Sequence, residues 1–67
     1  MLDKPLTRIE RDNEINLLKG CINRICVTDD EKELIRMIGS ANYRISRLAE
    51  SRSLELEAKK VDDFLNE

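Results

Sequence analysis

The chain has 67 residues, enough for one domain with a modest core, and carries 12 Lys and Arg against 14 Asp and Glu. A net charge of −2 argues against a general nucleic-acid binder, and no apolar run approaches the roughly 20 residues that a membrane-spanning helix needs. With 39% charged and 3% aromatic residues, the composition favours helices over sheets.

Cysteine and histidine usage limits the chemistry open to this chain. There is no histidine, and Cys21 and Cys26 would diverge by about 140° on a helix rather than form a disulfide. Free cysteines without a signal peptide are typical of the cytoplasm, where we expect the protein to be. An activated nucleophile is hard to build without a neighbouring base, so we expect no enzyme, no catalytic residue and no cofactor.

Residues 1–6 are predicted to form an extended arm, because Pro5 disfavours the helical conformation in the residue before it. Thr7 and Glu10 have the spacing of a capping box, which predicts that the first helix occupies residues 7–26. Its apolar positions recur at steps of three and four residues, as on one face of a helix. They are Ile15, Leu18, Ile22 and Ile25.

Thr28 and Glu31 repeat the capping signature, with Asp29 and Asp30 expected in the first turn of a second helix over residues 29–51. The acidic residues Asp29, Asp30, Glu31 and Glu33 lack the spacing of a calcium loop, so we expect no metal site. One continuous helix through this region is the alternative. The apolar seam of the second helix is Leu34, Ile38, Ala41, Ile45 and Leu48.

The two seams match in register if the chain folds back at residues 26–28. This predicts an all-α fold, an antiparallel helical hairpin in which Ile22 lies beside Ile38 and Ile15 beside Ile45. The apolar phase slips near Ser51. Residues 52–66 therefore either continue the second helix, making it long, or form a third, C-terminal helix.

The apolar stripe of residues 52–66 has no partner within the hairpin. Chains this small commonly gain stability by self-association when they lack disulfides and metals, so we expect a homo-oligomeric helical bundle. The residues predicted at the oligomer or partner interface are Leu17, Cys21, Ile35, Met37, Leu54, Leu56, Ala58, Val61, Phe64 and Leu65.

A basic stripe is predicted on the second helix, centred opposite its apolar seam. Guanidinium groups and an aromatic ring on one face suit a phosphate-bearing ligand or an acidic partner, although an ordinary solvated face would have the same pattern. The stripe consists of Lys32, Arg36, Ser40, Tyr43, Arg44 and Arg47.

These features favour a small, non-enzymatic regulatory or adaptor protein that acts through helix-mediated protein binding and self-association. Its size and plain design would suit a phage or a bacterium. The alternative function is an oligomeric protein that sequesters a nucleotide or another phosphorylated small ligand through the basic stripe. We expect neither a membrane nor nucleic acid as a partner.

Overall fold

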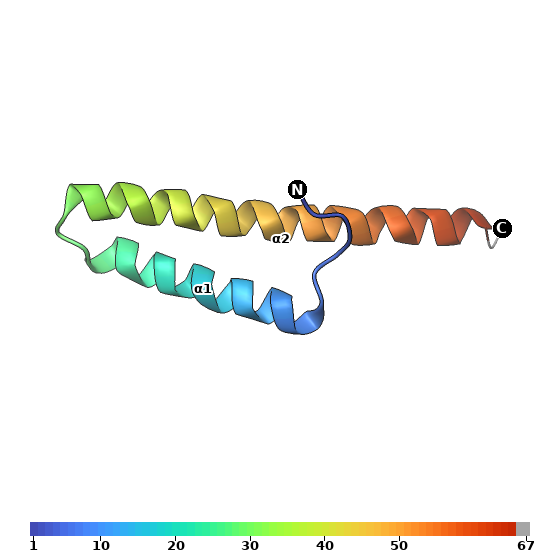
Figure 1. Cartoon of the computed structure of the whole chain (residues 1–67), viewed down its shortest axis with the longest axis horizontal. Coiled ribbons are helices and arrows are strands. Elements are labelled where there is room, and N and C mark those ends of the chain that lie inside the picture. The colour runs from blue at the N-terminus through green and yellow to red at the C-terminus, as the bar shows by residue number, and fades with distance from the viewer. Residues whose placement is uncertain (66–67) are drawn as a thin grey trace.

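The computed structural model describes residues 1–65 and has the form of a helical hairpin (Figure 1). Helix α1 spans Arg8–Val27 and helix α2 spans Glu31–Leu65. The two helices run antiparallel and pack against each other, and no strand occurs in residues 1–65. The predicted all-α hairpin is confirmed.

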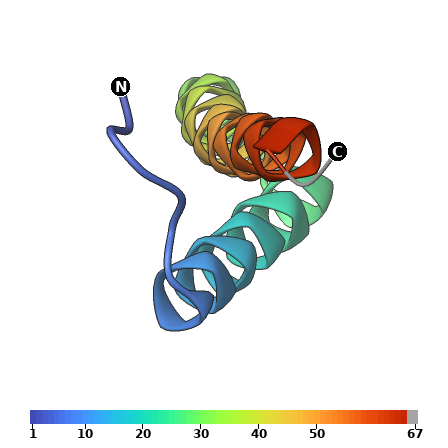
Figure 2. The ribbon, with the colours of Figure 1, turned by 90° about the vertical axis from the view of Figure 1, so that its right-hand side faces the viewer.

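The hairpin is elongated because α2 is much longer than α1. A compact chain of 67 residues has a radius of gyration of about 11 Å, whereas this chain has one of 15.8 Å and extents of 56 × 18 × 17 Å. Figure 2, which looks along α2 from its C-terminal end, shows α1 below α2 and the N-terminal arm on one flank. The C-terminal part of α2 extends past the start of α1 (Figure 1).

Both ends of α1 are closed by hydrogen bonds. The Glu10 backbone N–H donates to Thr7 Oγ1 at 3.2 Å, and the Thr7 N–H donates to Glu10 Oε1 at 3.0 Å. This is the predicted capping box. At the other end, the Thr28 N–H donates to the carbonyl of Arg24 at 3.0 Å.

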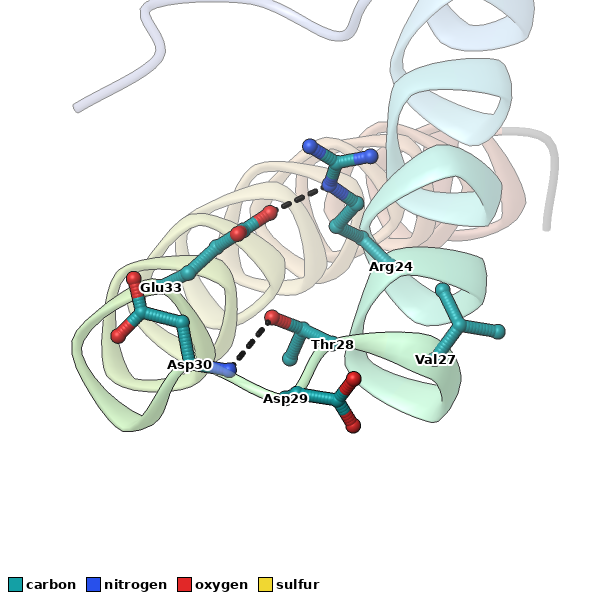
Figure 3. A pocket seen from close by; sticks show the side chains of 6 residues that line it. All are labelled: Arg24, Val27, Thr28, Asp29, Asp30 and Glu33. Atoms are coloured by element: carbon teal, nitrogen blue, oxygen red, sulfur yellow. Dashed lines mark hydrogen bonds and ion pairs between the residues drawn. The ribbon is translucent and has the colours of Figure 1, made fainter.

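The turn between the helices corrects the predicted start of the second helix (Figure 3). α2 begins at Glu31 and not at residue 29, and the break excludes one continuous helix. Asp30 Oδ1 accepts from the Lys32 N–H at 3.0 Å, so Asp30 is the cap. Thr28 Oγ1 instead accepts from the Asp30 N–H within the turn. Thr28 and Asp30 are both able to cap the second helix. The chain caps it with Asp30, so the helix begins two residues later than predicted.

Past Ser51, α2 continues without a break to Leu65, so no third helix forms within the described part of the chain. Arg52 and Glu55, one turn apart, form an ion pair at 2.9 Å across the position of the phase slip. Residue 66 of the predicted segment lies outside the described residues. Neither helix holds, within residues 1–65, a stretch long and apolar enough to cross a bilayer.

α2 is rotated about its axis relative to the predicted seam. Ile38 and Ile45, expected at the centre of the hairpin, are 44% and 51% exposed, and their expected neighbour Ile22 is also half exposed. Leu34, Ala41 and Leu48 of the predicted seam are buried or half-buried, but the least exposed positions of α2 follow a seam displaced toward the basic stripe. It consists of Met37, Ala41, Arg44, Leu48 and Ser51. This rotation lets a buried carboxylate of α1 bind Arg44 of the seam and the neighbouring Arg47.

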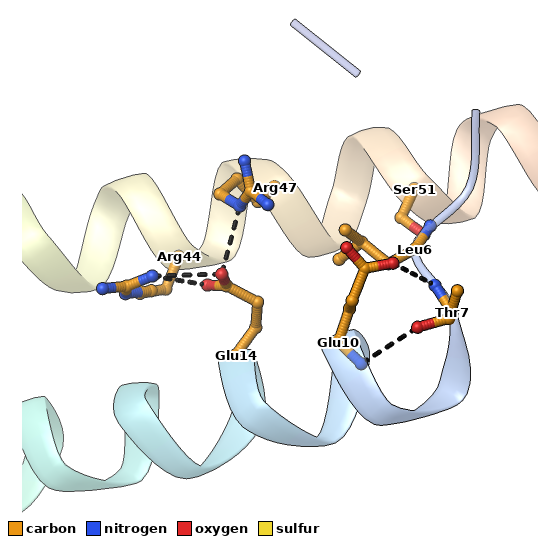
Figure 4. Close-up of polar contacts among 7 residues, drawn as sticks. All are labelled: Leu6, Thr7, Glu10, Glu14, Arg44, Arg47 and Ser51. Carbon is orange, nitrogen blue, oxygen red and sulfur yellow. Dashed lines mark hydrogen bonds and ion pairs between the residues drawn. The ribbon is translucent and has the colours of Figure 1, made fainter. Parts of the chain in front are cut away.

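The N-terminal arm covers one flank of α2 (Figures 2 and 4). The Leu6 N–H donates to Ser51 Oγ at 2.9 Å, and the Leu2 N–H donates to Glu50 Oε1 at 3.0 Å. Leu6 and Ser51 are both buried. The arm therefore closes the open end of the hairpin, which is a contact that the sequence does not reveal.

Glu10 should make the stability of the hairpin depend on pH. Hydrogen bonds with the backbone and side chain of Thr7 hold the pKa of Glu10 below its ordinary value of 4.5. A lowered folded-state pKa stabilises the fold above the unfolded value, and this contribution is lost as the pH falls through the folded pKa. We therefore expect Glu10→Gln to lower the Tm near pH 7, and the difference to narrow as the pH is lowered to about 3.

Thermal melts followed by circular dichroism measure this difference. Asp12→Asn, which removes an exposed carboxylate from the same helix, is the control for a general loss of negative charge. A Tm difference for Glu10→Gln that does not change with pH would contradict the proposed role of the carboxylate.

Candidate functional site

A buried carboxylate lies between the helices at the centre of the hairpin (Figure 4). Glu14 of α1 is only 8% exposed. Arg44 Nη1 donates to both of its carboxylate oxygens at 3.0 Å, and Arg47 Nε donates to Glu14 Oε1 at 3.2 Å. A carboxylate withdrawn from water needs such partners, and here two cations of α2 supply them.

Tyr43 completes this cluster on its solvent side. The guanidinium carbons of Arg44 and Arg47 lie 5.6 Å and 5.8 Å from the centre of its ring, within the range of cation–π attraction. Desolvation disfavours the charged form of Arg47, but Tyr43 and Glu14 outweigh it, and the pKa of Arg47 is raised. Both arginines are thus held by side chains of the hairpin itself.

Only part of the predicted basic stripe points away from α1. The structure brings Tyr43, Arg44 and Arg47 together, but it directs both arginines to Glu14. Ser40 is half-buried and accepts a hydrogen bond from Cys21 Sγ at 3.4 Å. Lys32 and Arg36 are exposed.

The location of Glu14 between the helices was not predicted from the sequence, because the prediction relied on periodic apolar residues and Glu14 is charged. The position of Glu14 along the helix nevertheless indicates this location. In the predicted register Glu14 lies beside residues 45 and 46, and it belongs to a series at steps of four, three and four that the structure buries or half-buries. This series is Glu14, Leu18, Cys21 and Ile25.

The predicted interface residues fall into two groups. Cys21, Met37 and Leu54 are half-buried, and the others are exposed. Among the exposed residues, Phe64 has 77% and Ile35 69% of its surface open to solvent. The remaining exposed members are Leu17, Leu56, Ala58, Val61 and Leu65.

A shallow depression of about 400 Å³ lies at the turn (Figure 3). An ion pair between Arg24 and Glu33 crosses it, and Asp30 caps α2. Across residues 1–65, no group of three or more acidic or thiol side chains is placed to hold a metal ion. Three of its polar side chains, Arg24, Asp30 and Glu33, are already paired or capping, so the depression is a feature of the turn.

No protein-family model matches the chain, and comparisons with curated proteins and with solved structures also find no match.

Glu14 should contribute more to stability than either arginine alone. We expect Glu14→Ala to lower the free energy of unfolding by about 1–3 kcal/mol, because it leaves two partly buried guanidinium groups without their acceptor. Arg47→Ala should lower it less, because Arg44 still pairs with the carboxylate. Urea denaturation at one fixed protein concentration measures both changes.

Arg36→Ala is the matched control, since Arg36 is an exposed arginine of the same helix. It should change the free energy of unfolding by less than about 0.5 kcal/mol. An effect of Glu14→Ala as small as that of Arg36→Ala would mean that the cluster does not hold the helices together.

Proposed function

We propose that this chain is a small, non-enzymatic regulatory or adaptor protein that acts through helix-mediated protein binding and self-association. The observation that supports this proposal is the lack of an apolar interior. In residues 1–65, Leu6 and Ala41 alone are both apolar and buried, whereas thirteen large apolar or aromatic residues are 42% or more exposed. Surfaces of this kind mark sites of protein–protein interaction.

The C-terminal part of α2 is the segment best suited to bind a partner. Leu54, Ala58, Val61 and Leu65 recur at steps of four, three and four, so they share one face of the helix beyond the start of α1. An apolar helix face with this spacing binds in the groove of another protein or joins a helical bundle. The acidic residues Glu55, Glu57 and Asp62 border this face, so a partner groove with basic edges would fit it.

Site-specific photo-crosslinking tests this assignment. Benzoylphenylalanine placed at Val61 should give a defined covalent adduct in the cells that make the protein, with the attached protein identified by mass spectrometry. Asp63 is the control position, because it lies about 160° round the helix from Val61. A combined Leu54→Asp and Leu65→Asp change should abolish the adduct. No adduct at Val61, or equal adducts at both positions, would overturn the proposed role of this segment.

The alternative function, sequestering a nucleotide or another phosphorylated ligand, has less support. Arg44 and Arg47 both pair with Glu14, so their guanidinium groups are less open to an external anion, and Lys32 and Arg36 are the exposed cations of the basic stripe. We therefore expect no rise in Tm when the protein is melted with a panel of mononucleotides and cyclic nucleotides. A rise that is lost in Arg36→Ala would instead favour the alternative.

A further inference from the structure

A second seam runs along α2 on a side that α1 does not cover. Its seven residues recur at alternating steps of four and three, the spacing of a seam between packed helices. All seven are exposed. We call it the outer stripe; it consists of Glu31, Ile35, Ile38, Asn42, Ile45, Ala49 and Arg52.

The outer stripe is separate from the contacts already made by α2. It lies about 110° round the helix from the seam that packs on α1. The N-terminal arm, fixed at Glu50 and Ser51, covers the other flank. In Figure 2 the arm lies to the left of α2, and α1 crosses below it from the lower left to the right. The residues of the outer stripe remain exposed between these contacts. A third helix could therefore pack on the outer stripe without displacing any part of residues 1–65.

Read outward from Asn42, the outer stripe has similar residue types in both directions, apart from opposite charges at its two ends. Ile38 and Ile45 come next on either side, then Ile35 and Ala49, and then Glu31 and Arg52. In an antiparallel pair of identical stripes, apolar residues would face apolar residues. Glu31 of each copy would lie within about one turn of Arg52 of the other, so Arg52, which pairs with Glu55 of its own helix, would gain a second carboxylate. A parallel pair would place like charges together.

The chain also exposes enough surface to form a dimer interface. A folded monomer of 7.8 kDa exposes about 4,400 Å², whereas this chain exposes 5653 Å². The excess of about 1,300 Å² exceeds the roughly 800 Å² that each partner buries in a stable interface. Burial of the outer stripe against a second copy would remove part of this excess.

We propose that the outer stripe binds the same stripe of a second copy of this chain, antiparallel, about a two-fold axis near Asn42. This inference rests on the proposed function and specifies its self-association. The resulting dimer is a four-helix assembly with the two α2 helices at its centre. The C-terminal segments project from opposite ends, where each stays open to a different partner.

Charge reversal at the ends of the outer stripe tests the arrangement. Arg52→Glu would place Glu31 near a second carboxylate at both ends of the interface. Sedimentation equilibrium in the micromolar range should show a dimer for the native chain and a dissociation constant raised about tenfold or more for Arg52→Glu. Glu31→Arg alone should weaken the dimer in the same way. The combined Glu31→Arg and Arg52→Glu variant should restore it.

Two further variants test whether the dimer forms through the outer stripe or through another surface. Ile38→Glu should give a monomer, and Val61→Asp, an exposed apolar position of the C-terminal segment, should leave the dimer intact. Circular dichroism checks that each variant stays helical. A native monomer, or a dimer that responds to Val61→Asp and not to the outer-stripe changes, would overturn the inference. The photo-crosslink at Val61 would still test the proposed function separately.

Crosslinking locates the two-fold axis and does not need a variant with weakened dimerisation. In a chain carrying Cys21→Ser and Cys26→Ser, Asn42→Cys should be joined to its copy by a short bismaleimide. Tyr43→Cys is the control, because residue 43 lies at nearly the same level but about 100° round the helix. Equal crosslinking of the two positions, or none at position 42, would overturn the inference.

Discussion

The carboxylate of Glu14 controls how the two helices face each other. It is nearly buried, and burying a charge is tolerated only when ionised or hydrogen-bonding partners replace the lost water. Arg44 and Arg47 provide them, and they can do so only when their side of α2 is turned toward α1. The same rotation moves Ile38 and Ile45 out of the hairpin to its outer surface. One ion cluster thus determines both what the hairpin buries and what it exposes.

The lack of an apolar interior follows from this rotation. The seam of α2 that faces α1 contains Arg44 and Ser51, and Arg47 lies beside it, so little apolar area is removed from water within one copy. Buried ion pairs contribute little net stability compared with apolar packing of the same volume. The N-terminal arm adds Leu6 to the interior but covers one flank alone. Most of the apolar side chains of α2 are therefore open to other helices.

Local signals in the sequence were sufficient for the hairpin but not for the rotation of its helices. The capping box of Thr7 and Glu10 depends on neighbouring residues, and it was predicted correctly. The rotation of α2 could not be predicted from periodicity, because two apolar stripes lie next to each other on this helix and either could face α1. The contact between Leu6 and Ser51 joins distant parts of the chain, and neither residue has a pattern that points to the other.

The Glu14 cluster is better explained by specificity than by stability. With apolar residues over a wide arc of α2, several rotations of the hairpin would bury similar apolar areas, and no single one would be selected. A buried charge that must meet Arg44 and Arg47 makes one rotation far better than the others. In the proposed dimer this selection leaves the outer stripe free for the second copy. The ion cluster then serves assembly indirectly, because it keeps the residues that would join two copies from being buried in one.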